Sequence, residues 1–102
     1  MEEVFRNAEA LEKKYDWVKA VDLYEQALGA VGKRDFLRKG EIQERISYCF
    51  YRAAFQAETR EVFKNRMELA AGAYEKAAEL FDNVEGLEKL AKTSHCKAMG
   101  VY

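Results

Sequence analysis

Residues 17–31 place small and aromatic side chains at intervals of three and four. Ala20, Tyr24 and Ala27 form the centre of this pattern, and Val31 continues it. Residues at this spacing share one face of an α-helix, because the helix has about 3.6 residues per turn. An alanine on that face allows a neighbouring backbone to approach closely, and the tyrosine ring fills the remaining space. The segment therefore predicts a helix that packs closely against another helix.

The composition of the whole chain favours helices over sheets. The 102 residues include no proline and only six glycines, so turn-forming residues are scarce. Alanine, glutamate, lysine and leucine, which are strong helix formers, are abundant. Apolar residues make up 49% of the chain and charged residues 34%, which is an ordinary globular composition. We therefore expect one all-α domain over residues 1–102.

The helical periodicity recurs along the chain and predicts about five antiparallel helices joined by short turns. Their expected ranges are residues 2–14, 17–31, 36–58, 60–82 and 86–100. Asp16, Asp35 and Thr59 precede three of these ranges, and such side chains commonly accept hydrogen bonds from the first turn of a helix. Gly32 follows the second range, where a left-handed glycine would end the helix. Gly40 is expected to break the first turn of the third helix.

The alanine, tyrosine and alanine of residues 20–27 recur in residues 70–77 with the same internal spacing. The residues of the first hairpin that fit the same scheme are Ala8, Leu11, Trp17, Ala20, Tyr24, Ala27 and Leu28. This set resembles the tetratricopeptide repeat (TPR). The resemblance implies helical hairpins stacked into a superhelix, in which the first helix of each pair lines a concave surface. It also implies a scaffold for protein–protein contacts that binds a peptide or helix of a partner.

Two features depart from a regular array of such repeats. Tyr74 lies fifty residues after Tyr24, whereas the regular period is about 34 residues. Gly32 stands where a proline commonly ends a repeat. The chain also resembles, more weakly, the three-helix microtubule-interacting and trafficking (MIT) type of domain, through its first hairpin and the basic residues Arg45 and Arg52. That resemblance implies a trafficking adaptor.

A stripe of arginines and rings on the third expected helix is the candidate partner-binding site. Arg45, Tyr48, Arg52 and Phe55 lie three or four residues apart. Arginine pairs bidentately with carboxylates, and aromatic side chains anchor apolar groups, so the stripe suits an acidic or amphipathic peptide. In the alternative interpretation, the rings pack against a neighbouring helix and the arginines pair with glutamates of their own helix.

Self-association is a second interpretation of the same chain. The fifth expected helix carries apolar residues without a polar end, and a symmetric dimer would bury them. The residues concerned are Leu90, Ala98, Val101 and Tyr102.

Single-stranded nucleic-acid binding is a third and less favoured interpretation. Basic residues with tyrosines between them can stack on bases and pair with phosphates. The residues are Arg34, Arg38, Lys39, Arg45 and Arg52. The net charge of −1 argues against it, because no global field draws the chain to a polyanion.

The sequence does not favour catalysis, a metal or a cofactor. His95 is the single histidine, and no phosphate loop, HExxH motif or EF-hand loop occurs. Cys49 and Cys96 are far apart and form no CxxC pair, so we expect free thiols in a reducing, cytoplasmic setting. No apolar run is long enough to cross a membrane. We expect a binding protein with no cofactor and a protein or peptide partner.

Overall fold

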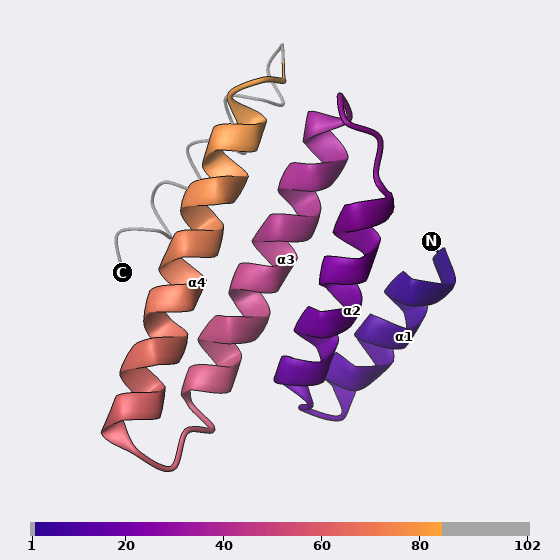
Figure 1. Cartoon of the computed structure of the whole chain (residues 1–102). Helices are drawn as coiled ribbons and strands as arrows, with labels where there is room; N and C mark the ends of the chain where they lie inside the picture. The colour runs from indigo at the N-terminus through magenta and orange to yellow at the C-terminus, as the bar shows by residue number, and fades with distance from the viewer. Residues whose placement is uncertain (1, 85–102) are drawn as a thin grey trace.

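The computed structural model describes residues 2–84, which form four α-helices and no strand (Figure 1). The helices are α1 (Glu2–Lys13), α2 (Trp17–Ala30), α3 (Phe36–Ala54) and α4 (Arg60–Phe81). The all-α expectation is confirmed for this part of the chain. The fifth expected helix, residues 86–100, lies outside the described residues.

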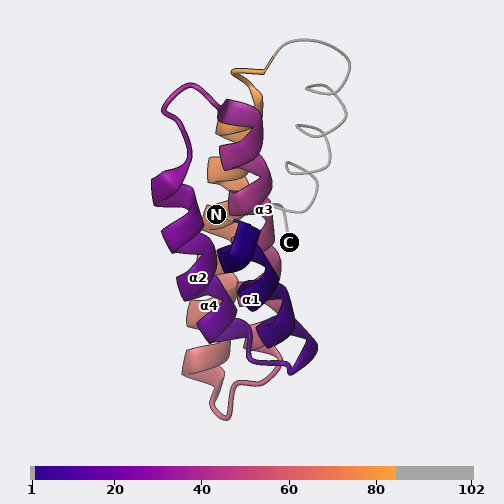
Figure 2. The same cartoon turned by 90° about the vertical axis from the view of Figure 1, so that its right-hand side faces the viewer.

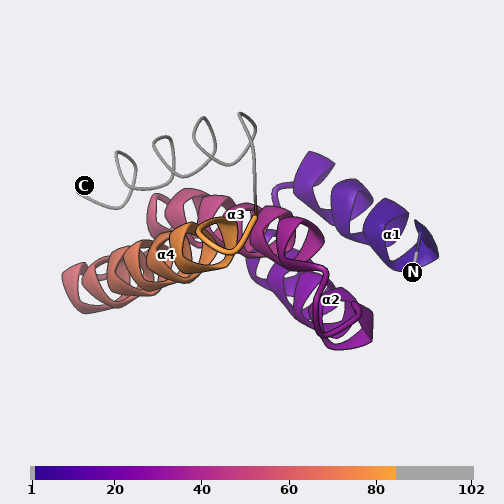
Figure 3. The same cartoon turned by 90° about the horizontal axis from the view of Figure 1, so that it is seen from above.

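Consecutive helices run in opposite directions and build two layers. Figures 1 and 2 show α1 and α2 as one hairpin and α3 and α4 as the next. Seen from above, α1 and α3 lie in one layer, and α2 and α4 lie in the other (Figure 3). The helix α3 is therefore central, with α1 and α2 on one side and α4 on the other. None of the helices in the described part is both long and apolar enough to cross a membrane.

The end of α3 differs from its expected position at residue 58. The α-helix stops at Ala54, because Phe55, Gln56 and Ala57 each donate a backbone hydrogen bond three residues back instead of four. Such tighter turns are common at helix C-termini. Arg66 of α4 also donates from Nη1 to the backbone oxygen of Ala53 at 2.8 Å, so this carbonyl accepts from both Gln56 and Arg66.

Two of the three expected N-caps are confirmed. Asp35 accepts a hydrogen bond from the backbone of Arg38, and Thr59 accepts one from the backbone of Val62, both at 3.2 Å. The prediction for Asp16 is wrong, because its side chain makes no cap hydrogen bond. Its carboxylate lies 3.7 Å from the ammonium of Lys19, an exposed pair with little effect on stability.

The left-handed residue of the first hairpin is Tyr15, with φ of 62°. It ends α1, and the backbone N–H groups of Tyr15 and Asp16 both donate at 2.9 Å, to Glu12 and Leu11 respectively. This is the Schellman arrangement that more often contains glycine. Gly32, expected in this role, lies outside the left-handed region. The helix α2 instead ends because Val31 is extended.

The repeated alanines and tyrosines are buried in both hairpins of the fold. Tyr24 is 2% exposed and Tyr74 is 4% exposed. The main core contains Ala8, Trp17, Ala20, Val21, Tyr24, Ala27, Ile42, Ile46, Cys49, Ala53 and Ala73. A second cluster, at the other end of the α3–α4 pair, contains Ala77, Ala78 and Phe81, with Leu37 packed against it.

Gly40 lies inside α3 and does not break it, so that expectation is wrong. A Cβ atom at this position would lie 2.4 Å from Cε1 of Phe81, closer than side chains tolerate. The glycine therefore makes room for the phenyl ring of α4. Nearby, Ser47 donates its hydroxyl hydrogen to the backbone oxygen of Ala70 at 2.5 Å. These small residues allow α3 and α4 to pack closely.

Candidate functional site

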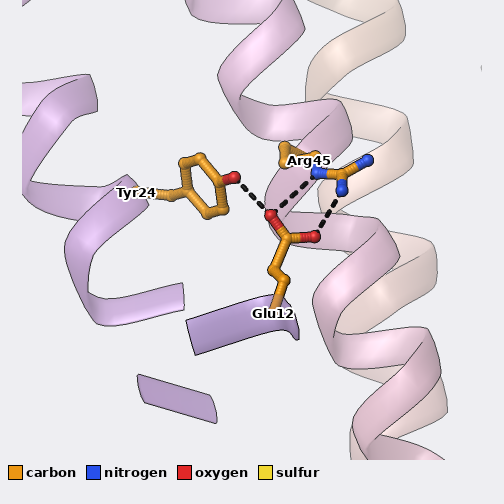
Figure 4. A network of polar contacts seen from close by, with 3 residues as sticks. All are labelled: Glu12, Tyr24 and Arg45. Carbon is orange, nitrogen blue, oxygen red and sulfur yellow. Dashed lines mark hydrogen bonds and ion pairs between the residues drawn. The ribbon is translucent and has the colours of Figure 1, made fainter. Parts of the chain in front are cut away.

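A buried carboxylate joins the first three helices. Glu12 of α1 is only 5% exposed. The hydroxyl of Tyr24 on α2 donates to Glu12, and Nε of Arg45 on α3 donates to the same oxygen at 3.1 Å. The Nη2 atom of Arg45 lies 2.5 Å from the other oxygen of Glu12. Figure 4 shows the carboxylate between the phenol and the guanidinium.

The surroundings of this network fix its charges. A buried charge is costly unless it is paired and hydrogen-bonded, and Arg45 both pairs with Glu12 and donates a hydrogen bond to it. Burial opposes the charge of Arg45, but the hydrogen bond and the attraction from Glu12 outweigh it and raise the pKa of the guanidinium above its ordinary value. Burial, together with the adjacent carboxylate, also raises the pKa of the Tyr24 phenol above its usual range. The network is a fixed ion pair with a neutral phenol.

Arg45 is the middle member of a row of three arginines on α3. Arg38, Arg45 and Arg52 are seven residues apart, so their side chains leave the same face of the helix. Each guanidinium lies over an aromatic ring. The distances from the guanidinium carbons to the ring centroids are 4.6, 4.8 and 5.2 Å, for the rings of Phe5, Tyr48 and Trp17 respectively. We call these three residues the arginine row.

The arginine row borders a groove between α1 and α3. One part of the groove has a volume of about 720 Å³ and the other about 360 Å³, and Glu9 and Arg45 line both parts. The larger part is lined by Phe5, Arg6, Glu9, Tyr24, Arg38, Glu41, Ile42 and Arg45. The smaller part is lined by Glu9, Glu12, Lys13, Trp17, Arg45 and Tyr48. We call these two adjacent depressions together the α1–α3 groove.

Two of the four expected binding residues, Arg45 and Tyr48, line the α1–α3 groove. Arg52 lines neither part but lies over the ring of Trp17, which lines the smaller part. Tyr48 also packs edge-on against Trp17, with ring centroids 5.7 Å apart. The pairing of Arg45 with Glu12 crosses from α3 to α1, which neither interpretation of the sequence anticipated.

Phe55 lies in a different cluster, although it belongs to the same expected stripe. Its side chain is 63% exposed. Its ring packs edge-on against Tyr51, with centroids 5.1 Å apart, and against Phe63 of α4, with centroids 6.0 Å apart. We call these three residues the exposed aromatic cluster. Phe55 lies beyond the C-terminal end of α3, where the chain turns toward α4, and so cannot continue the stripe.

Glu12, Arg38 and Phe5 are groove residues that the expected stripe omitted. For Glu12 a signal was present in the sequence: it lies four residues after Ala8, on the face of α1 that the periodicity assigns to the core. An acidic residue on such a face indicates a buried polar partner. Arg38 is one heptad before Arg45, and its position over Phe5 depends on how α1 meets α3.

The other residues singled out from the sequence are the cysteines, possible metal ligands and the residues expected in self-association. Burial, reinforced by the charge of Glu12, raises the pKa of the Cys49 thiol to about 12, so this cysteine stays protonated and unreactive near neutral pH. Within residues 2–84, no group of three or more histidine, cysteine or acidic side chains is placed to hold a metal ion. The residues expected in self-association, Leu90, Ala98, Val101 and Tyr102, lie outside the described residues.

Comparisons with protein-family models, with curated proteins and with solved structures find no match to this chain.

Proposed function

We propose that this domain is a protein–protein interaction module that holds a peptide segment of a partner in the α1–α3 groove, without catalysis of its own. The observation that carries the proposal is the arginine row, whose guanidinium groups are already oriented on rings beside an open groove. Binding then orders few additional side chains, and this lowers the entropic cost of association.

The arrangement of helices supports a TPR-type scaffold as the finer description of the fold. The first helices of the two hairpins, α1 and α3, share one layer (Figure 3). The buried tyrosines, Tyr24 and Tyr74, occupy the second helices. In a TPR-type array, the first helices form the ligand surface, and this is where the α1–α3 groove lies.

The charges of the groove favour an acidic segment over a purely apolar one. Arg38 and Arg52 carry positive charge at its two ends, while Glu12 compensates the charge of Arg45 in the middle. Guanidinium groups stacked on rings still present their N–H edges to solvent, where they can donate paired hydrogen bonds to a carboxylate. Apolar side chains of the ligand would contact Phe5 and Ile42 on the walls.

A peptide-display selection on the immobilised full chain tests the proposal. Selected peptides should shift the amide resonances of residues in α1 and α3 that line the α1–α3 groove. Glu9 is exposed and lines both parts, so Glu9→Trp should fill the groove and weaken binding about tenfold or more. The matched control is Glu75→Trp, at an exposed position of α4. Peptides that bind Glu9→Trp as tightly as the control would contradict the groove as the site.

Self-association is the second candidate, favoured by the exposed aromatic cluster. Phe55 is 63% exposed and Phe63 is 38% exposed, and their rings are in contact, so together with Tyr51 they form an apolar patch of the kind that can mark a contact between proteins. Sedimentation equilibrium at two concentrations decides the matter. A dimer that dissociates in Phe55→Ser establishes this candidate, and a monomer at both concentrations rejects it.

A further inference from the structure

The three members of the arginine row follow one another at a constant spacing along the α1–α3 groove, and we call this spacing the repeat distance. Seven helical residues rise about 10.5 Å and return nearly to the same angular position, so the three arginines leave the backbone of α3 nearly in line. The guanidinium groups of Arg38 and Arg52 lie over the rings of Phe5 and Trp17, and this stacking leaves their N–H edges able to donate. Arg45 uses Nε and Nη2 for Glu12 and retains the N–H groups of Nη1. All three arginines therefore have donors for an external acceptor.

The repeat distance discriminates between backbone conformations of a bound peptide. A polyproline II segment has three residues per turn and rises about 3.1 Å per residue, so every third side chain returns to one face after about 9 Å. A β-strand covers a similar distance in three residues but turns the third side chain to the opposite face. An α-helix needs seven residues for this distance, so a helical ligand would carry one carboxylate per heptad, a different sequence pattern.

On the basis of the proposed function, we infer that the ligand is a polyproline II segment with a carboxylate at every third position, each carboxylate pairing with one member of the arginine row. The difference of about 1 Å per turn between ligand and row is within the reach of long, flexible acidic side chains. The preformed polyproline II conformation loses little entropy on binding, which suits a shallow groove.

The groove favours a peptide over a nucleic-acid strand. Glu9 lines both parts of the groove and would repel a continuous phosphate backbone. A peptide carries acidic groups only at intervals and can pass Glu9 with a neutral residue. In addition, the rings of Phe5 and Trp17 are already covered by guanidinium groups, so these faces cannot stack on bases.

Fluorescence anisotropy with synthetic peptides and the full chain tests this inference. The probe is a fluorescein-labelled peptide with three glutamates at every third position, separated by proline and alanine. Its isomers have the same composition but carry the glutamates in one block or at every second position. The periodic peptide should bind about tenfold more tightly than either isomer, because only it reaches all three arginines in one conformation.

Charge-matched variants separate the arginine row from general electrostatics. Arg38→Gln with Arg52→Gln should reduce the affinity for the periodic peptide about tenfold or more and remove the preference over the isomers. Lys64→Gln with Lys76→Gln, which removes the same charge from exposed positions of α4, should change the affinity by about twofold or less. Arg45 is left intact because it also neutralises buried Glu12. Circular dichroism checks that both variants fold.

Four outcomes would overturn the inference: equal affinities for the three isomers, no detectable binding of the periodic peptide, an equal loss in the lysine variant, or tighter binding of an oligothymidylate of about ten nucleotides. Failure here is distinct from failure of the proposed function. If display-selected peptides shift groove resonances while the periodic peptide does not bind, the groove is a peptide site of different chemistry. If no selected peptide reaches the groove, the proposed function itself fails.

Discussion

The two sides of α3 are packed by different means. Toward α4 the contact uses small residues: Gly40 accommodates the ring of Phe81, and Ser47 reaches the backbone of Ala70. Toward α1 the contact uses long polar side chains, with Arg45 extended to Glu12. Small residues bring the helix axes together and leave no space for a ligand. Long side chains connect α3 to α1 at Arg45–Glu12 and at Arg38–Phe5 and leave a groove beside these contacts. The helix α3 is therefore closely packed on one side and borders an open surface on the other.

The largest expected effect concerns the polar side of this comparison. Arg45→Leu removes the cationic partner of Glu12, which is 5% exposed, and leaves a buried carboxylate uncompensated. The free energy of unfolding should fall by about 3 kcal/mol, at the lower end of the usual range for breaking a buried pair because Arg45 itself is half-exposed. Urea denaturation followed by circular dichroism at pH 7 measures the change.

A second variant tests whether the pair of Glu12 and Arg45 adds to the free energy of unfolding or only offsets the cost of burying each charge. Glu12→Leu with Arg45→Leu replaces both charges by apolar groups and should recover most of the loss, because buried ion pairs contribute little beyond mutual compensation. If the double variant is no more stable than Arg45→Leu, the network is a net source of stability, and the polar side of α3 is more than a neutralised contact.

The next effect concerns the small-residue side. Gly40→Ala would place a methyl group 2.4–2.9 Å from three ring carbons of Phe81, and such overpacking costs about 1–3 kcal/mol. Alanine gains up to about 1 kcal/mol over glycine in a helix interior, so the net loss should be about 1 kcal/mol. Gly72→Ala is the matched control in α4, because nothing lies within 4 Å of the added atom. It should raise stability, by about 0.5–1 kcal/mol. Equal effects of the two substitutions, measured by urea denaturation, would show that α3 and α4 are not closely packed at Gly40.

The positions of the helices follow from local sequence, whereas the joints between them do not. The periodicity of apolar residues places all four described helices to within a few residues, because burial on one face imposes that spacing. Gly40 is read locally as a break, since its close neighbour Phe81 is distant in sequence. Asp16 likewise meets the local criteria for a cap, but Tyr15 adopts the left-handed conformation just before it and turns the chain into α2.

The candidate site is predictable in part for the same reason. The spacing of Arg45, Tyr48 and Arg52 assigns them to one face of a helix, and these residues do stand together at the α1–α3 groove. Their partners Glu12 and Trp17 come from other helices, and only the packing of α1 and α2 against α3 determines which residues meet. Phe55 is separated from them because the α-helix ends at Ala54.

Alkaline pH should lower the free energy of unfolding through two buried groups, Cys49 and Tyr24, on the side of α3 that faces α1 and α2. The pKa of Cys49 is raised from 9.0 to about 12, and that of Tyr24 is raised above its ordinary value of 10.0. Above about pH 9 the unfolded chain releases the thiol proton while the folded chain keeps it. The free energy of unfolding therefore falls as pH rises from 9 toward 12, by up to about 1.4 kcal/mol per pH unit for the thiol, and Tyr24 adds to the slope above pH 10. Below pH 9 this contribution to stability is fully present.

The difference between the parent chain and Cys49→Ala isolates the thiol, because all other titrating groups are common to both. Urea denaturation of both chains at pH 8, 9 and 10 gives the difference between their free energies of unfolding. This difference should change by about 1 kcal/mol between pH 9 and pH 10. A difference that stays constant over this range would mean that the thiol titrates alike in the folded and unfolded chains. Cys49 would then be accessible to water, and the packing of α3 toward α1 and α2 would be looser than its burial indicates.

The smallest effect compares the helix starts on the two sides of α3. Thr59 begins α4 and accepts a hydrogen bond from the backbone of Val62, so Thr59→Ala should cost about 1 kcal/mol. Asp16 begins α2 without a cap hydrogen bond, and Asp16→Ala removes only an exposed pair with Lys19, which should cost about 0.3 kcal/mol. Thermal melts of the two variants in parallel measure the difference. A larger loss for Asp16→Ala would show that its carboxylate caps α2 in solution, and the left-handed turn at Tyr15 would then not be sufficient to begin that helix.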